Sequence, residues 1–187
     1  MQYYNNFPFA SLRLKDAAHF SKHTVKPMWE DARNQDGGAW YFRIPEGHLS
    51  TAQGQSGQEP LALEFFQQVL LAAVGDDLAK FVQPRDDICG VSITKRWQAF
   101  VIMIWTRRGD QSKTIEGVKE AVLSQASDAI KEILSNEKNC YYKKHREHAG
   151  FDDTLAKQMM QEYERRKAEN NMFSPEDQRP SHFARPF

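Results

Sequence analysis

The chain has 187 residues, with 25 basic and 25 acidic side chains and a formal net charge of zero. At about one domain per 150 residues, this length predicts one domain with polar tails rather than two full domains. Zero net charge excludes a purely electrostatic nucleic-acid binder but is compatible with a local basic patch. The two cysteines, Cys89 and Cys140, are too few for a disulfide framework, and no zinc-ligand spacing surrounds them.

Neither a targeting segment nor a transmembrane segment is expected. The first residues lack the basic and apolar regions of a signal peptide. The longest apolar stretch, near Val69 to Val74, is far shorter than the roughly 20 residues that span a bilayer. We therefore expect a soluble intracellular protein.

One strand and one helix are predicted in the first half of the chain. Residues 1–23 are rich in aromatic and aliphatic side chains without a clean period, which fits either a packed arm or a chain cut from something longer. Alternating large apolar residues predict a half-buried strand over 38–44, followed by an exposed polar loop over 46–60. Apolar residues at helical spacing then predict a helix that begins near Pro60 and ends at Gly75.

A hairpin and further helical pattern are predicted in the second half. Alternating runs over 91–94 and 100–105 predict two antiparallel strands joined by a charged tip. Residues 115–133 follow with the pattern of a long amphipathic helix, with a break near Ser127. A short strand is expected over 140–142.

The C-terminal part is much more polar. Residues 152–170 fit one charged helix with a thin apolar stripe, capped by Asp152 and Asp153. Residues 171–187 contain several prolines and scattered charge, which predicts disorder.

The order of these elements indicates the fold class. Strands interleaved with about three helices, without a βαβ rhythm, indicate an α+β fold around an antiparallel sheet. We expect this domain to occupy residues 1–150, and the charged helix with its tail to occupy residues 151–187.

Trp29 and Glu30 form the most informative pair in the sequence. Pro27 holds the residue before it in an extended conformation, and the glycines at 37 and 38 indicate a turn, so we expect Trp29 on a loop. A tryptophan on a loop commonly packs over the edge of a core. The alternative is a stacking platform, because an aromatic face attracts a flat cationic ring and the Glu30 carboxylate accepts hydrogen bonds from that ring's N–H edge.

7-Methylguanine is such a ring. Methylation at N7 gives it a positive charge, and its N1–H and exocyclic amine point one way as two donors. In a capped RNA the ring also carries a triphosphate, which requires cations nearby. Arg96 at the hairpin tip offers a planar group with several donors, and Lys95 offers a point charge. Taken alone, Arg96 fits a solvated turn residue better.

The sequence resembles the mRNA cap-binding translation initiation factor 4E family over roughly residues 19 to 148. The joint spacing of four blocks is specific to this resemblance. The blocks are Pro27-Met28-Trp29-Glu30-Asp31 with Gly37-Gly38-x-Trp40, Val74-Gly75-Asp76 after an apolar helix, Ile88-Cys89-Gly90 at the start of a strand, and Arg96 ahead of Ile104-Trp105-Thr106.

The resemblance implies a curved antiparallel sheet backed by three helices, with the cap bound on the concave face. It implies that Trp29 is one of two stacking tryptophans and that Glu30 reads the guanine. Arg96 would contact the phosphates, and Trp105 would touch the N7-methyl group. Lys143 is a further candidate for a phosphate contact.

The resemblance also implies a partner on the convex face. There the helix that carries Val69, Leu70 and Leu71 would dock a Tyr-x4-Leu-Φ helix (Φ apolar) of an initiation factor 4G-type scaffold or of repressor proteins. Gln67 stands where a leucine is usual, which mildly favours a cap-binding repressor as the alternative function. The family implies action in the cytoplasm, with the nucleus as a further location.

The sequence departs from the family at its N-terminal end. The resemblance places the first strand and the loop with the other stacking tryptophan upstream of Tyr3 and Tyr4, which are poor substitutes for that ring. We therefore expect weaker cap binding from residues 1–187 than from a two-sided sandwich. An interaction module that has lost cap binding is the corresponding alternative.

An enzyme is the other class of function to weigh. A small hydrolase that uses Glu30, Asp31 and a histidine such as His145 is conceivable, but no nucleophile elbow, phosphate loop or metal motif is present. His145 and His148 lie near Cys140 without a suitably spaced fourth ligand, so we expect no metal site. We expect a non-catalytic binding protein that needs no cofactor.

Overall fold

The computed structural model of the protein describes residues 9–49 and 60–172. Tyr3 and Tyr4, the middle of the loop over 46–60 and the tail beyond residue 172 lie outside these residues. The expectation of disorder over 171–187 therefore concerns a segment that lies almost wholly outside the described chain.

One antiparallel sheet with helices forms the fold, and the predicted α+β class is confirmed. Its strands lie in the spatial order β1-β3-β4-β2-β5, and the sheet is not closed into a barrel. The strands are β1 (Ala17–Ser21), β2 (Gly38–Pro45), β3 (Ile88–Arg96), β4 (Ala99–Thr106) and β5 (Cys140–Lys144). The helices are α2 (Leu61–Val74), α3 (Ser112–Gln125), α4 (Asp128–Leu134) and α5 (Asp153–Met172), with short 3-10 helices η1 (Phe9–Ser11), η2 (Leu78–Phe81) and η3 (His145–Glu147).

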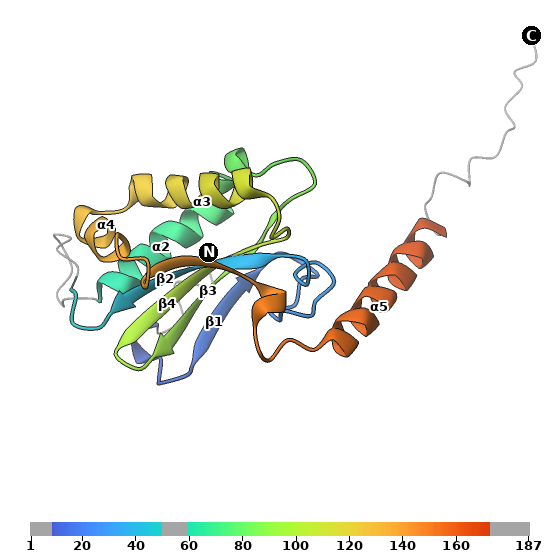
Figure 1. The fold of residues 1–187 in the computed structure, drawn as a ribbon, viewed down its shortest axis with the longest axis horizontal. Helices are drawn as coiled ribbons and strands as arrows, with labels where there is room; N and C mark the ends of the chain where they lie inside the picture. Colours follow the sequence, from blue (N-terminus) through green and yellow to red (C-terminus); the bar gives the residue numbers. More distant parts are fainter. Residues whose placement is uncertain (1–8, 50–59, 173–187) are drawn as a thin grey trace, which may run out of the picture.

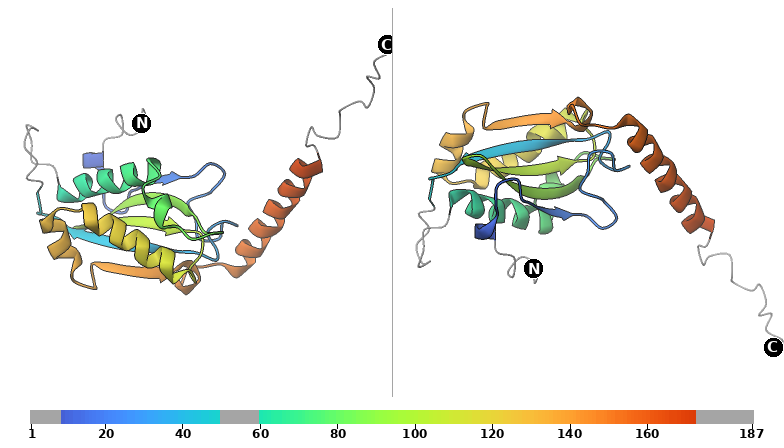
Figure 2. Two further views of the ribbon diagram at one scale, coloured as in Figure 1. Left: turned by 90° about the horizontal axis from the view of Figure 1, so that it is seen from above. Right: turned by 90° about the horizontal axis from the view of Figure 1, so that it is seen from below.

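The sheet has two unlike faces. Helices α2, α3 and α4 lie together on one side of it (Figure 1). Seen from below, the strands of the other side have no described helix over them (Figure 2). We call these sides the helix face and the open face. Helix α5 follows β5 and η3 and projects away from the sheet (Figure 1).

The main core lies between the sheet and the helices. Trp40, Phe42 and Ile44 of β2 are at most 5% exposed and pack with residues such as Ile102 of β4 and Phe66 of α2. Burial of this apolar surface is the main stabilising contribution to a fold of this kind. Because successive side chains of a strand point to opposite faces, the residues between these positions face the open side.

A second, smaller cluster lies on the open face. Its buried members come from β2, β3, β4 and the loop before β2, and they are Val25, Ala39, Cys89, Met103 and Trp105, with Trp29, Tyr41 and Val101 packed against them. The cluster joins the loop that carries Trp29 to the sheet.

The predicted helices and strands are confirmed in position. Helix α2 ends at Val74, and the Gly75 N–H donates to the Leu71 carbonyl at 2.8 Å. The break near Ser127 is also confirmed, because the Ser127 hydroxyl caps α4 by accepting from the Ile130 N–H at 3.5 Å. Within the described part of the chain, no helix is long and apolar enough to cross a membrane.

Strand β1 is not predicted by the sequence pattern. Only two of its positions, Ala18 and Phe20, point towards the core, so the alternation is short and weak. Pairing with β3 fixes the strand, with Ala18 opposite Ile93 and Phe20 opposite Val91. Tertiary contact therefore decides the conformation where local propensity does not.

Gly37 and Gly38, at the start of β2, follow a turn and allow close packing. Neither Gly37 nor Gly38 has a positive φ. A Cβ atom on Gly37 would collide with the Thr106 carbonyl oxygen, and one on Gly38 would lie 2.5 Å from the Tyr142 hydroxyl and 2.6 Å from the Lys143 carbonyl oxygen. The expected turn is confirmed over residues 32–36, where the Gly37 N–H donates to the Asn34 carbonyl at 2.7 Å, and the two glycines also let β2 lie close to β4 and β5.

Candidate functional site

The loop between β1 and β2 carries Trp29 and Glu30 and is fixed by its own side chains. The Asp31 carboxylate accepts from the Lys26 N–H at 3.1 Å and from the Arg33 N–H at 2.9 Å. The Asn34 side-chain amide donates to the Lys26 and Met28 carbonyls, both at 2.9 Å. Asp31 and Asn34 are buried at 5% and 1% exposure. The loop therefore holds a defined conformation without a helix or strand of its own.

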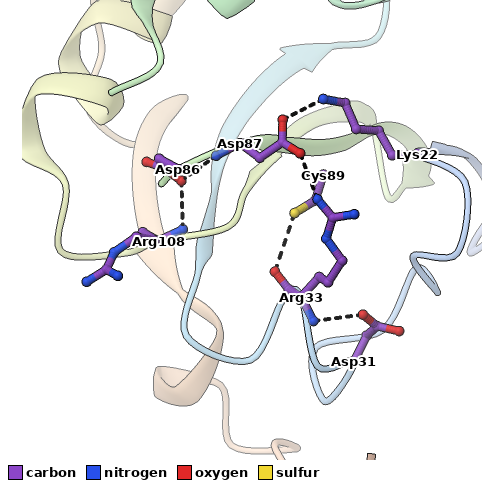
Figure 3. A network of polar contacts seen from close by, with 7 residues as sticks. All are labelled: Lys22, Asp31, Arg33, Asp86, Asp87, Cys89 and Arg108. Atoms are coloured by element: carbon purple, nitrogen blue, oxygen red, sulfur yellow. Dashed lines mark hydrogen bonds and ion pairs between the residues drawn. The ribbon is translucent and has the colours of Figure 1, made fainter. Parts of the chain in front are cut away.

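A polar network ties the same loop to the start of β3 (Figure 3). The Asp87 carboxylate forms ion pairs with Arg33 at 2.8 Å and with Lys22 at 2.5 Å. The Cys89 thiol donates to the Arg33 carbonyl at 3.4 Å. Burial, followed by the negative charge of Asp87, raises the pKa of the Cys89 thiol to about 12, so the thiol keeps the proton that it donates. The loop is thus anchored at its middle as well as at its ends.

Trp29 lies on this loop, as predicted, and its ring has an aromatic partner. The His148 ring stacks on it with a centroid distance of 4.2 Å and an interplanar angle of 9°. The Tyr41 hydroxyl and His148 Nε2 are 3.1 Å apart and share a hydrogen bond. Tyr41 in turn stacks on Tyr141 at 5.1 Å. Aromatic rings from three parts of the chain therefore gather at one end of the open face. The three parts are the β1–β2 loop, β2, and β5 with the residues that follow it.

Glu30 is 7% exposed, and its carboxylate is engaged. Its Oε1 accepts from the Asp152 backbone N–H at 3.1 Å. The Asp152 carboxylate accepts from the Thr154 and Leu155 N–H groups at 2.9 and 3.1 Å, so Asp152 caps α5 as predicted. Asp153 instead forms an ion pair with Arg146, at 3.0 Å. Glu30 is thus linked through one backbone group to the start of α5.

Trp105 lies beneath the same end of the open face. It is 6% exposed, and its indole N–H donates to the Ser92 hydroxyl at 2.8 Å. The His145 ring lies 4.7 Å from it, centroid to centroid. His145 is fully buried, and neither of its ring nitrogens has a hydrogen-bond partner. Burial, followed by the nearby His148, lowers the pKa of His145 to about 3, so this ring is neutral at ordinary pH.

The cationic residues expected near a phosphate chain lie on different faces. Arg96 is exposed and lies opposite Ala99 on the open face, and its charge acts on the Tyr41 hydroxyl. Lys143 lies opposite Ala39 and shares that face. Lys95 has the opposite orientation: it pairs with Glu46 and lies over the Phe100 ring at 4.2 Å. The structure therefore brings Arg96 and Lys143, but not Lys95, to the face of Trp29.

The residues expected to dock a partner differ in exposure. Val69 and Leu70 are only 2% and 6% exposed and belong to the core, whereas Leu71 is 44% exposed. Val74, one turn further along α2, is 65% exposed. The expectation is corrected for Val69 and Leu70, because only side chains that leave the core are available to a partner. The exposed side of α2 consists here of Leu71 and Val74, with Gln67 beside them.

Sequence reasoning missed the contacts that the segment over 145–152 makes with Trp29 and Glu30. The resemblance places Lys143, Lys144 and His145 near the phosphates or the second nucleotide, and the residues alone suggest His145 only for hydrolysis or, with His148, for metal binding. Cys140 lies on the helix face, and the described residues contain no cluster of three metal-ligating side chains. No local sequence pattern predicts the contacts with Trp29 and Glu30, since Glu30 and its partner Asp152 are 122 residues apart.

Comparison with known proteins identifies relatives of the chain. The family model described as Eukaryotic initiation factor 4E matches residues 1–160. The translation initiation factor NCBP of Arabidopsis thaliana is 28% identical over 104 residues, 56% of this chain and 39% of that protein. Translation initiation factor 4E of Candida albicans is 31% identical over 111 residues, 59% of this chain and 48% of that protein. The chain thus matches less than half the length of these curated relatives.

Solved structures support the fold. A complex of Caenorhabditis elegans eIF4E-3 with the 4E-binding protein Mextli and cap analog gives a TM-score of 0.57 at 21% identity, covering 81% of this chain and 76% of that one. A complex of Ascaris suum eIF4E-3 with m2,2,7G cap gives a TM-score of 0.58 at 19% identity, covering 81% and 74%. At these identities the likeness concerns the fold alone.

The buried His145 makes stability depend on pH. In the unfolded chain the pKa of this histidine is about 6.5, whereas in the folded protein it is lowered to about 3. Between these values the unfolded chain binds a proton that the folded protein does not. The free energy of unfolding should therefore fall as the pH falls from 6.5 towards 3, by up to about 1.4 kcal/mol per pH unit.

Urea denaturation at a series of pH values measures this dependence. His145→Leu should show a shallower fall than the wild type over the same range, because it removes one titrating group and leaves the other histidines in place. Parallel pH profiles for the two proteins would contradict the assignment of a neutral, buried His145.

Proposed function

Because the chain belongs to the eukaryotic initiation factor 4E family, we propose that it binds the 7-methylguanosine cap of mRNA and takes part in translation initiation. The observation that carries this proposal is the pair Trp29 and Glu30, adjacent on a loop that Asp31 and Asn34 hold in place. Further support comes from the solved structures of the same fold, which hold eIF4E-3 proteins with a cap analog or with m2,2,7G cap.

The pair meets both chemical requirements of the methylated base. The indole face of Trp29 attracts a flat cationic ring, which N7-methylation of guanine creates. The two oxygens of Glu30 suit the two N–H donors on one edge of that ring, and a charged acceptor makes such hydrogen bonds stronger. Trp105 at the same end of the open face offers an apolar surface for the N7-methyl group.

The position of Arg96 fits an elongated ligand. Ser92 of β3 is level with Tyr41 across the sheet, and Arg96 lies four residues further along the strand, a rise of about 13 Å. A ligand that reaches from Trp29 to Arg96 must therefore be extended, as a base followed by a phosphate chain is. We assign Arg96 and Lys143 to the phosphates.

A partner on the helix face is the second part of the proposal. Leu71 and Val74 form an exposed apolar pair on α2, which suits the apolar side of a Tyr-x4-Leu-Φ helix. The partner would be an initiation factor 4G-type scaffold in the cytoplasm. The alternative function of this chain is that of a cap-binding repressor without productive scaffold contact, which the exposed Gln67 beside this pair favours.

A binding role is favoured over hydrolysis by the state of Asp31 and His145. Both Asp31 oxygens accept hydrogen bonds that fix the loop. His145 is buried without a partner on either ring nitrogen. A general base needs contact with the proton that it removes, and these groups are committed to the structure instead.

Trp29→Ala should weaken binding of a methylguanosine cap analogue by roughly 5- to 150-fold, because base–aromatic stacking contributes about 1–3 kcal/mol. Isothermal titration measures the dissociation constant. Trp97→Ala is the matched control, since Trp97 is 73% exposed at the β3–β4 turn and has no assigned role. Unchanged affinity for Trp29→Ala would remove Trp29 from the site.

Glu30→Gln should reduce the preference for methylated over unmethylated guanosine triphosphate. The amide has one acceptor oxygen and no charge, so the cationic methylated ring loses more than the neutral ring does. The ratio of the two dissociation constants tests this, with Glu132→Gln on the exposed side of α4 as the control. A ratio equal to that of the wild type refutes the role of Glu30 in reading the base.

Leu71→Arg should weaken binding of a Tyr-x4-Leu-Φ peptide about 10-fold or more, because a central apolar contact is replaced by a charge. Fluorescence anisotropy with a labelled peptide measures the affinity. Leu14→Arg is the control, since Leu14 is similarly exposed, at 49% against 44% for Leu71, but lies before β1. If both variants bind the peptide as the wild type does, the docking surface lies elsewhere.

A further inference from the structure

One segment covers every residue assigned to the methylated base. We call residues 145–152 the connecting segment, because they join β5 to α5. Its His145 lies against Trp105, its His148 lies against Trp29, and its Asp152 N–H bonds Glu30. Gly150 passes so close to Trp29 that an added Cβ atom would contact the indole ring at 3.5 Å.

The contact with Trp29 has the geometry of a bound base. His148 is a flat heteroaromatic ring, nearly parallel to the indole at 9° and 4.2 Å from it. A further ring between the two would need them about 7 Å apart, at one van der Waals separation on each side. At 4.2 Å, no base fits between His148 and the face of Trp29 that it covers.

The contact with Glu30 has the chemistry of the same base. A guanine edge would offer N–H donors to the carboxylate, and here the Asp152 N–H donates to Oε1 at 3.1 Å. Glu30 is buried, and a buried carboxylate without donors is costly. The connecting segment satisfies this requirement while no ligand is bound.

We propose that the connecting segment is an internal ligand of the base site, and that a cap binds only by displacing His148 from Trp29 and the Asp152 N–H from Glu30. This inference rests on the proposed function. The affinity for a cap is then the intrinsic affinity multiplied by the fraction of molecules in which the segment has left the site.

Displacement also acts on α5. Asp152 caps this helix with its side chain while its backbone N–H bonds Glu30, so both roles meet in one residue. Arg146 holds the segment from the other side through ion pairs with Asp36 at 3.2 Å and Asp153 at 3.0 Å. A cap that takes Glu30 therefore frees the first turn of α5 from the loop that carries Glu30.

The test is titration of the full chain with a methylguanosine cap analogue. His148→Ala removes the stacked ring and should lower the dissociation constant about 5-fold or more, the low end of the contribution of one stacked ring. His148→Phe keeps a stacked ring and should show no such gain. His48→Ala is the control, because His48 is exposed in the loop after β2.

Hydrogen exchange on the same samples provides a second readout. Saturating cap analogue should raise exchange of the Asp152 amide and of the first turn of α5 in the wild type. A dissociation constant that stays the same or rises in His148→Ala would overturn the inference. A rise would mean that His148 contacts the bound cap and does not compete with it.

The two claims fail in different ways. If the wild type binds the analogue and His148→Ala brings no gain, the internal ligand is refuted and the proposed function stands. If neither the wild type nor His148→Ala binds, while both remain folded, cap binding itself is refuted and displacement by a cap is refuted with it.

Discussion

The candidate site depends on hydrogen bonds within the loop between β1 and β2. Asp31 accepts from two backbone N–H groups of that loop, and Asn34 donates to two of its carbonyls. Irregular backbone has no ladder to satisfy its polar groups, so buried side chains must do so. These two side chains fix the backbone that presents Trp29 and Glu30, and a stacking platform needs a fixed position to bind well.

The two faces of the sheet separate the main core from the candidate site. On β2, Trp40 and Phe42 point into the core under the helices, whereas Ala39 and Tyr41 point to the open face. The alternation of a strand allows one segment to serve both.

Periodicity and turn chemistry predict much of the fold. The strand at 38–44, the helix that ends at Gly75 and the break at Ser127 each have a local cause that can be read from neighbouring residues. Pro27 likewise allows Trp29 to be placed on a loop. Strand β1 is not predicted, because pairing with β3 holds it in place and its own hydrophobic alternation is weak.

Sequence reasoning predicts less of the site. Val69, Leu70 and Leu71 are all apolar, so the sequence does not reveal that only Leu71 leaves the core. The partner of Trp29 is missed for another reason: His148 reaches it through a loop with no period, from a strand at the far edge of the sheet. Contacts of this kind follow from topology and not from spacing.

The most direct measurement of the central claim is a set of intermolecular nuclear Overhauser effects in the complex with a 7-methylguanosine nucleotide. The account predicts contacts from the N7-methyl protons to the indole rings of Trp29 and Trp105, together with loss of the contacts between His148 and Trp29. Methyl contacts to another part of the protein, with the His148 and Trp29 rings still stacked at saturating nucleotide, would contradict it.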